Sequence, residues 1–227
     1  MSDERVSRGM RTLLAERRER IGAGERPLGW KVGFGSPANL ARLRLSGPLV
    51  GFLTDRGLLE DPATCALAGW TNPVVEAEIA VHFAADVLGG ATDAEAAAAI
   101  DGLGPAIELA DIDPSRDDPE EILAANIFHR HVILGPVSTS VHSAGGVRGR
   151  VFRNGIETAV AEDAEALPGP LLAVVRRVAD VCAEHGERLR AGDVLIAGSV
   201  VPPQPAAPGD VFRVELSPLG ALQVSFT

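Results

Sequence analysis

Alternating apolar and polar residues mark much of the chain as β-structure. Side chains on a strand point to opposite faces in turn, so a period of two is typical of a strand whose two faces differ. Asn154–Gly155 stands between two β-branched runs and is the residue pair that favours a type I′ turn. The pattern therefore predicts a hairpin at 150–160 and further strands at 30–34, within 48–59, and at 72–83, 104–111, 129–135, 192–200 and 209–226.

Apolar residues at helical spacing mark most of the remaining chain. Thr92 and Glu95 have the spacing of a capping box at the start of one such segment. Strands outnumber helices and rarely alternate with them, which favours an α+β fold with a mixed, mostly antiparallel sheet. We expect one structural unit over 29–227, preceded by an N-terminal helical extension over 1–28. The predicted helices cover residues 2–23, 38–46, 91–103, 117–126 and 170–189.

The strand predicted at 72–83 carries an unusual pair of charges. Its sequence is NPVVEAEIAVHF, so Glu76 and Glu78 share one face while the other face is wholly apolar. Two glutamates in this relation lie about 7 Å apart at Cα, close enough to share one cation. The alternative explanation is a half-solvated surface strand with both carboxylates in water.

A second predicted strand supplies a third carboxylate. In GPAIELAD, Glu108 shares a face with Ala106 and Ala110, a surrounding in which a charge needs a partner. Three carboxylates brought together without a cation would repel, and some would have to hold protons. Mg²⁺ or Mn²⁺ would suit such a set of hard oxygen ligands. We therefore expect Glu76, Glu78 and Glu108 to converge on one divalent cation.

Charge and cysteine content narrow the class of protein. The chain has 31 acidic and 21 basic residues, a formal net charge of −10, which argues against nucleic acid or an anionic membrane as the main partner. Cys65 and Cys182 stand in no metal-binding spacing, so two buried free thiols are expected. The N-terminus is too charged for a signal peptide, and no apolar run approaches the length of a membrane span. A cytoplasmic protein is expected.

His129 and His131 form an H-x-H pair, a spacing that also occurs in zinc sites. No third ligand stands at a suitable spacing, so the three-carboxylate site remains the preferred hypothesis. A histidine on the face of a strand is also commonly structural.

Several of these motifs occur together in a known family. VVEAEIAVHFAADV, followed about 30 residues later by LGPAIELAD, resembles the fumarylacetoacetate hydrolase superfamily, nearest to its 2-keto-4-pentenoate hydratase and 4-oxalocrotonate decarboxylase branch. The resemblance runs nearly end to end. It includes GWKVGFGSP, PLVGFLTDRG, the NGIETAV hairpin, the long helix with GDVLIAGS, and the closing PGDVFRVELSPLGALQVSF. The E-x-E strand with its downstream P-A-[IL]-E is the most specific part.

This resemblance implies a compact mixed β-roll with flanking helices, commonly assembled as a homo-oligomer. It implies that Glu76, Glu78 and Glu108 ligate Mg²⁺ or Mn²⁺, with Glu76 also counted as catalytic. Lys31 would lie at the active site, where it would transfer a proton, bind substrate or neutralise substrate charge. His129 stands in a segment where related hydratases have small residues, and it is a candidate to replace a proton-transfer group, a structural histidine being the alternative.

Substrate contacts are expected from three further segments. The resemblance places the PLVGFLTDRG segment and Asn126 at the substrate. A backbone N–H and a hydroxyl in LIAGSV could hold a substrate carboxylate, although this stretch also fits a plain strand end. The residues expected to bind substrate are Lys31, Gly51, Phe52, Leu53, Asn126, Gly198 and Ser199.

The implied activity is that of a metal-dependent lyase that adds water to a 2-hydroxy-2,4-dienoate, the enol form of a short 2-oxo acid. Leu49 stands where hydratases of this branch usually carry an acidic residue, which favours a decarboxylase on the same scaffold. A C–C hydrolase on the same scaffold is a further alternative, in which the metal-bound 2-oxo group would accept the electron pair of the broken C–C bond. A non-catalytic homologue that only binds 2-oxo acids is the alternative from another class, and the intact set of three glutamates argues against it.

Overall fold

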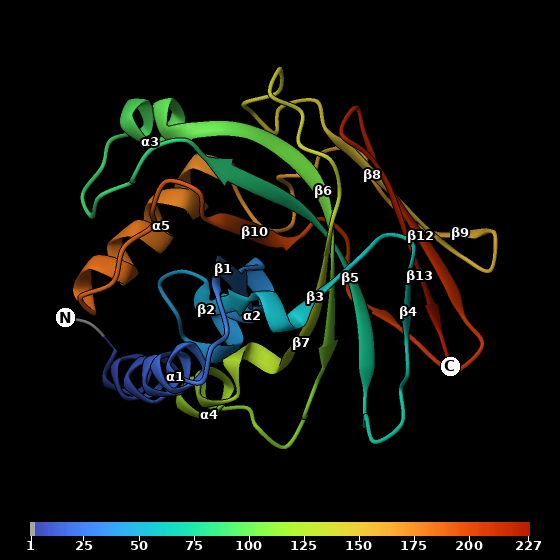
Figure 1. Ribbon diagram of the computed structural model, residues 1–227, viewed down its shortest axis with the longest axis horizontal. Helices are drawn as coiled ribbons and strands as arrows, with labels where there is room; N and C mark the ends of the chain where they lie inside the picture. The colour runs from blue at the N-terminus through green and yellow to red at the C-terminus, as the bar shows by residue number, and fades with distance from the viewer. Residues whose placement is uncertain (1–2) are drawn as a thin grey trace.

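The computed structural model describes residues 3–227 and is built on two sheets (Figure 1). The eight-stranded sheet has the order β2-β1-β10-β5-β6-β7-β3, with β11 paired to β5 outside this path. The five-stranded sheet has the order β4-β13-β12-β8-β9. Only the pairs β1 with β10, β3 with β7 and β4 with β13 are parallel among the pairings of the described chain. The predicted α+β class with a mixed, mostly antiparallel sheet is confirmed.

The bounds of the elements follow the hydrophobic pattern closely. The strands of the large sheet are β1 Pro27–Gly33, β2 Leu49–Thr54, β3 Leu58–Leu59, β5 Pro73–Phe83, β6 Ile100–Asp111, β7 His129–Leu134, β10 Val194–Ser199 and β11 Gln204–Pro205. Those of the small sheet are β4 Ala63–Cys65, β8 Arg148–Arg153, β9 Ile156–Ala161, β12 Val211–Ser217 and β13 Gly220–Phe226. The helices are α1 Glu4–Gly22, α2 Pro37–Leu43, α3 Asp93–Ala99, α4 Pro119–Ala124 and α5 Leu171–Glu184, with 3₁₀ turns η1 Asp55–Gly57 and η2 Asn126–Phe128.

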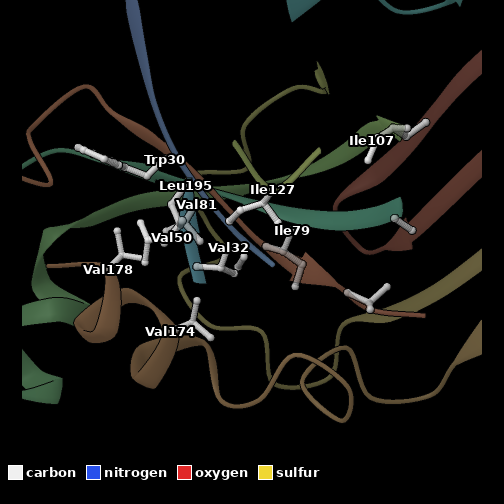
Figure 2. Close-up of a cluster of buried hydrophobic side chains, with 14 of the residues drawn as sticks. Trp30, Val32, Val50, Ile79, Val81, Ile107, Ile127, Val174, Val178 and Leu195 are labelled. Atoms are coloured by element: carbon white, nitrogen blue, oxygen red, sulfur yellow. The ribbon is translucent and has the colours of Figure 1, made fainter. Parts of the chain in front are cut away.

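One face of the large sheet packs against α5. Figure 2 shows Val174 and Val178 of this helix close to apolar side chains from β1, β2, β5 and β10. Ile79 and Val81 of β5 belong to this main core, as the period-two pattern of that strand predicts. Burial of these aliphatic side chains supplies about 1.5–3 kcal/mol each, which fixes the strand with its other face turned away from α5.

The opposite face of β5 is also buried. It contributes Ala80 to a second, smaller apolar cluster with Ala106, Val132 and Ile196, and the two glutamates of the E-x-E sequence lie on this same face. The long strands β5 and β6 curve round the shorter β1 and β2 in Figure 1. The explanation of 72–83 as a half-solvated surface strand is therefore wrong.

The N-terminal helix shares the core of the rest of the chain. Met10, Leu13 and Leu14 of α1 are buried in the main apolar cluster, and α1 lies against α4 (Figure 1). Gly9 allows the close approach, because a Cβ at that position would lie 2.8 Å from the Cβ of Leu123. The division into an extension over 1–28 and a unit over 29–227 stays a prediction.

Local turn chemistry agrees with the sequence in two places. Thr92 and Glu95 form the capping box at the start of α3, and Asn154 and Gly155 have φ values of 54° and 80°, as a type I′ turn requires.

All five predicted helices are shorter in the structure, and Ser2 of the first lies outside the described residues; the helices predicted over 117–126 and 170–189 end at Ala124 and Glu184. The helix predicted over 91–103 ends at Ala99, because Ile100 already pairs with Phe83 of β5. Gly102 in this part of β6 lies against another segment, where a Cβ would meet the carbonyl oxygen of Ser138 at 2.6 Å. The helix predicted over 38–46 ends at Leu43, where Arg44 takes a left-handed conformation.

Cys65 and Cys182 are both buried and free, as expected from their spacing. Within residues 3–227, no helix combines the length and apolar character needed to cross a membrane.

Candidate active site

Three glutamates come together where β5 and β6 pair. Glu76 lies directly opposite Glu108 in the antiparallel register, and Glu78 follows Glu76 on the same face of β5. Carboxylate oxygens of the three residues all lie within 4.8 Å of one another. Glu78 and Glu108 are 0 % and 1 % exposed, whereas Glu76 is half-buried and reaches a cavity. The structure thus brings together the three carboxylates that the sequence predicts as a cluster.

Burial and mutual repulsion disturb two of these carboxyl groups. The pKa of Glu76 is raised to about 7, first by burial and then by the charge of Glu108, with Lys31 opposing both. The pKa of Glu78 is raised well above its usual value by burial and by the charges of the other two glutamates. Without a cation, both carboxyl groups therefore keep their protons to a higher pH than an ordinary glutamate does.

The donor set fits a hard divalent cation. One oxygen of Glu78, Oε2, accepts a hydrogen bond of 2.8 Å from the Gly198 N–H. Its other oxygen, Oε1, is buried and has no hydrogen-bond partner among the described residues. An unpartnered carboxylate oxygen is costly inside a protein, and a cation shared with Glu76 and Glu108 would satisfy it. Oxygen ligands alone, with no thiolate or imidazole in the set, favour ions such as Mg²⁺ or Mn²⁺.

Glu108 differs from the other two because it has partners inside the protein. Lys31 of β1 forms a buried ion pair with its Oε1, and His129 Nδ1 lies 2.8 Å from the same oxygen. Burial acts to raise the pKa of Glu108, but the charge of Lys31 and the hydrogen bond and charge of His129 outweigh it and lower the pKa. Lys31 Nζ also lies 3.4 Å from the carbonyl oxygen of Ile127. Glu108 is therefore the ionised member of the cluster, with Lys31 as its counter-ion.

The structure places His129 behind Glu108 rather than in the cavity. Burial lowers the pKa of its ring, and Nδ1 lies within hydrogen-bond distance of the Glu108 carboxylate. Nε2 has no partner among residues 3–227 and points towards Gly57, where a Cβ would lie 3.2 Å away. His129 is not part of the cavity lining. Its position suits the orientation of Glu108 and does not suit direct proton transfer to a substrate.

The H-x-H pair does not form a metal site. His129 contacts Glu108, whereas the ring of His131 stacks on Trp70 with the centroids 6.0 Å apart. In the part of the chain that the structure describes, the one cluster of three potential metal-ligating side chains is that of the glutamates.

A strained turn closes the site beside Lys31. Asn126, Ile127 and Phe128 have φ values of 46°, 54° and 62°, three successive left-handed residues that are not glycine. Such a conformation costs about 1–3 kcal/mol per residue and persists only where the surroundings hold it. The Asn126 amide does so, because Oδ1 accepts from the Phe52 N–H and Nδ2 donates to the Phe52 carbonyl, both at 3.0 Å.

Two glycines make room for this turn. A Cβ at Gly33 would lie 2.6 Å from Ile127 Cγ2, and a Cβ at Gly51 would lie 2.7 Å from Asn126 Oδ1. Neither position tolerates a side chain while the turn is in place. Gly51 therefore has a clear structural role in seating Asn126.

The cavity next to the carboxylates has a volume of about 450 Å³. Lys31 and Glu76 line the cavity, and the rest of its wall includes the segment that follows β1, the strained turn, Leu167 and Pro168, and residues from the chain between Gly198 and Pro203. The size falls within the range of about 300–1,000 Å³ that is typical of small-molecule sites.

The predicted substrate-binding residues are divided by the structure. Gly51, Phe52, Leu53 and Asn126 do not line the cavity. Phe52 and Leu53 are buried in the two apolar clusters on opposite faces of the sheet, because neighbouring residues of a strand point in opposite directions. Their side chains are therefore not available for contact with a substrate from this cavity.

Gly198 and Ser199 do line the cavity, but their donors are engaged. The Gly198 N–H donates to Glu78, and the Ser199 hydroxyl donates to the carbonyl oxygen of Val201 at 2.7 Å. Gly198 is better placed to hold a glutamate than to hold a substrate carboxylate.

The cavity also contains residues that the sequence reasoning missed. Phe34 and Phe128 form an edge-to-face pair with ring centroids 6.3 Å apart, and both line the cavity together with Ile112. The glycine-flanked loop GFGSP was a usable signal for Phe34. Nothing in the local pattern distinguishes Ile112 or Phe128 from ordinary core residues.

Comparison with known proteins identifies the family of the chain and several relatives. The model of the family described as "Fumarylacetoacetate (FAA) hydrolase C-terminal" matches residues 47–227. A 4-oxalocrotonate decarboxylase from Pseudomonas sp is 32 % identical over 226 residues, covering 96 % of this chain and 84 % of the relative. A 2-hydroxyhexa-2,4-dienoate hydratase from Comamonas testosteroni is 30 % identical over 217 residues, covering 92 % and 82 %.

A solved structure is also similar over nearly the whole chain. It is the 4-oxalocrotonate decarboxylase from Pseudomonas putida G7 in complex with magnesium and adipate, at a TM-score of 0.89 and 28 % sequence identity. The match covers 95 % of this chain and 83 % of that one. The mixed β-roll expected from the sequence resemblance is therefore confirmed.

Proposed function

Because the chain belongs to the fumarylacetoacetate hydrolase family, we propose that it is a divalent-metal-dependent lyase that adds water to a 2-hydroxy-2,4-dienoate. The observation that carries the proposal is the arrangement of Glu76, Glu78 and Glu108 beside Lys31 at one end of a cavity. Related hydratases and decarboxylases, one of them solved with magnesium, support it.

Glu76, Glu78 and Glu108 are the residues that would hold the cation, and Mg²⁺ or Mn²⁺ is the proposed identity. When bound, such an ion supplies a Lewis acid that stabilises negative charge on the 2-oxygen of a chelated α-keto acid. Glu76 is the ligand exposed to the cavity, so it lies nearest to any substrate. Gly198 holds Glu78 in place through its N–H, and His129 holds Glu108 through Nδ1.

Lys31 is the proposed catalytic cation. It is 2 % exposed, lines the cavity and is held between Glu108 and the carbonyl of Ile127. An ammonium group in this position neutralises the charge of a substrate carboxylate and donates a hydrogen bond to a developing oxyanion. The apolar walls beyond it exclude water from the rest of the substrate, which strengthens these interactions.

The proposed reaction has two parts. The proton of the 2-hydroxyl group is lost and a proton is added at C5, which leaves a 2-oxo-3-ene with an electrophilic C4. The oxygen of water then bonds to C4 while a proton is added at C3, and the product is a 4-hydroxy-2-oxo acid. Lys31 is the group placed to exchange protons with the substrate at the cavity end that holds the carboxylates.

The test is to incubate the protein and Mn²⁺ with 2-hydroxypenta-2,4-dienoate and follow the ultraviolet absorbance of the diene. We expect the absorbance to fall, with a product that has gained water and with no release of CO₂. The absence of metal-dependent turnover for a panel of 2-hydroxydienoates and acylpyruvates would contradict the proposal.

A decarboxylase acting on a 2-oxo diacid is the second candidate. Leu49, at the position where related hydratases carry an acidic group, is buried in the main core and offers no polar atom to the site. The similarity to 4-oxalocrotonate decarboxylases points the same way. In this reaction the 2-oxo group of the substrate, polarised by the proposed cation, would accept the electron pair of the C–C bond as CO₂ leaves. Metal-dependent release of CO₂ from 4-oxalocrotonate would favour it over the hydratase.

A non-catalytic protein that only binds 2-oxo acids can be separated from both with oxalate, which mimics the chelating head of the substrate. A rise in melting temperature that needs both Mg²⁺ and oxalate supports a working site. A small 2-oxo acid is thus the proposed ligand.

We also propose that the protein is cytoplasmic and that it forms a homo-oligomer. Sedimentation equilibrium measures the oligomeric state.

A further inference from the structure

Most of the cavity wall is apolar. Apart from Lys31 and Glu76, the lining includes Phe34, Ile112, Ile127, Phe128, Leu167 and Pro168. The other polar side chains in the lining, Ser36, Asn39 and Ser199, are uncharged. Among the described residues, a ligand in the cavity therefore meets charged side chains only at Lys31 and Glu76.

The lining offers little positive charge. Lys31 is the one cationic side chain in the lining that the described residues form, and it is ion-paired with Glu108. Arg42 lies outside the lining, with its guanidinium over the ring of Phe34 at 5.8 Å, and is exposed. A second carboxylate on a ligand would enter an apolar surrounding without a partner, which costs several kcal/mol.

The volume leaves room for a sizeable tail. At about 450 Å³, the cavity is larger than the chelating head of an α-keto acid needs. The edge-to-face pair of Phe34 and Phe128 gives the wall flat aromatic surface, which favours contact with hydrocarbon or with another ring. The turn that carries Phe128 is held by the buried Asn126 amide, so this wall is fixed before a ligand arrives.

From these observations we infer that the substrate of this protein has an uncharged, apolar tail, such as an alkyl, alkenyl or aryl group, and is not a dicarboxylate. The inference rests on the proposed function, because it assigns the head of the substrate to the glutamate end. It chooses between two kinds of relative, since both mono- and dicarboxylate substrates appear in the names of similar proteins.

The test compares 2-oxohexanoate with 2-oxoadipate, which share the head and the chain length and differ in a terminal methyl or carboxylate group. Oxalate represents the head alone. With Mg²⁺ present, calorimetry should show 2-oxohexanoate binding at least about tenfold more tightly than 2-oxoadipate, from the cost of burying the unpaired charge. Equal binding, or tighter binding of 2-oxoadipate, would overturn the inference and leave the proposed function standing. If oxalate and both oxo acids fail to bind, the proposed function itself fails.

Variants of a residue in the cavity wall provide a second test of the preference for 2-oxohexanoate over 2-oxoadipate. Ile112→Arg should reverse the preference in favour of 2-oxoadipate, while Ile112→Met, the uncharged control of similar reach, should keep the wild-type order. The affinity for oxalate should stay unchanged in both. Leu167→Arg is a second variant that tests the same point if Ile112→Arg does not fold.

The exposed arginine outside the lining is the remaining source of positive charge. Arg42→Ala should leave the ratio of the two affinities unchanged. A selective loss of 2-oxoadipate binding in Arg42→Ala would show that this arginine anchors a second carboxylate, and would overturn the inference.

Discussion

The glutamate cluster and the aromatic wall of the cavity are built in different ways. In the glutamate cluster, the regular end of the site, Glu76, Glu78 and Glu108 lie on adjacent regular strands, and their meeting follows from strand register. In the aromatic wall, the irregular end of the site, Phe34 and Phe128 lie outside the regular strands, and both have left-handed backbone conformations. Strand pairing thus positions the proposed metal ligands, whereas the aromatic wall depends on packing and on the two hydrogen bonds of the Asn126 amide.

The largest expected effect comes from breaking the regular end. Glu76→Gln should lower metal-dependent turnover by more than about 100-fold, because loss of a direct ligand costs more than loss of an outer contact. The fold should remain, since the amide has the same shape and the side chain of Glu76 makes no hydrogen bond within residues 3–227, while its backbone stays in the β5–β6 pairing. Steady-state kinetics and thermal melting measure the two quantities. Full activity in this variant would exclude Glu76 as a ligand.

The next largest effect comes from the clamp of the irregular end. Asn126→Ala removes two buried hydrogen bonds to Phe52 and the residue best suited to a left-handed conformation. We expect a loss of about 2–4 kcal/mol in the free energy of unfolding, measured by urea denaturation, together with a higher KM.

A matched control exists for this change. Asn154 is also left-handed and also makes two hydrogen bonds, to Asp210 and Val211, but it lies in the hairpin of the small sheet. Asn154→Ala should cost less stability, because the site is exposed, and should leave KM unchanged. A raised KM in the Asn154 variant would show that the rise in KM follows from a general loss of stability and not from the loss of the Asn126 hydrogen bonds.

Substitution of His129 tests how far metal binding by the three glutamates depends on the contact between His129 and Glu108. His129→Ala removes the hydrogen bond to Glu108 and should weaken Mg²⁺ binding by about 10–100-fold, measured by calorimetry. His129→Asn, whose amide can occupy the position of Nδ1, should restore part of the affinity. At saturating metal, kcat should change little, because His129 does not line the cavity. A lost kcat with unchanged metal affinity would instead make His129 a proton-transfer group.

The smallest effect is a dependence of metal binding on pH. Because the pKa of Glu76 is raised to about 7 and the pKa of Glu78 is also raised well above its usual value, the folded metal-free protein holds protons that the unfolded chain has already lost. Its stability should therefore fall as pH rises through about 7. A cation must displace these protons, so the affinity for Mg²⁺ should rise by up to about tenfold per pH unit for each proton displaced. An affinity that stays constant between about pH 6 and pH 8 would contradict this.

The glutamate cluster and most of the strands and helices can be predicted from the sequence. Period-two alternation identified β5 and placed Glu76 and Glu78 on one face, and the lone charge of Glu108 among alanines identified its partner strand. The same reasoning could not place Gly51, Phe52 or Leu53. The alternation of apolar and polar residues shows which side chains share a face of a strand. It does not show that the side chain of Asn126 fills the space beside Gly51.

The irregular end depends on contacts distant in sequence. The left-handed conformations of Ile127 and Phe128 run against the backbone preferences of Ile and Phe, although Asn126 tolerates its own, so no propensity predicts three such residues in succession. They persist because tertiary contacts with Gly33 and Phe52 outweigh the local cost. The sequence marks His129 as a candidate for proton transfer, but its position next to Glu108 follows from the pairing of β7 with β6 and the packing of η2 on β2 and β6.

The central claim is that three carboxylates from two paired strands hold one divalent cation at the end of an apolar cavity. Crystals of the protein grown with Mn²⁺ and measured at the manganese absorption edge test it directly. We expect one strong anomalous peak within coordination distance of Glu76, Glu78 and Glu108. A peak bound by other residues, or no peak there while Lys31 remains the sole partner cation of Glu108, would contradict the claim.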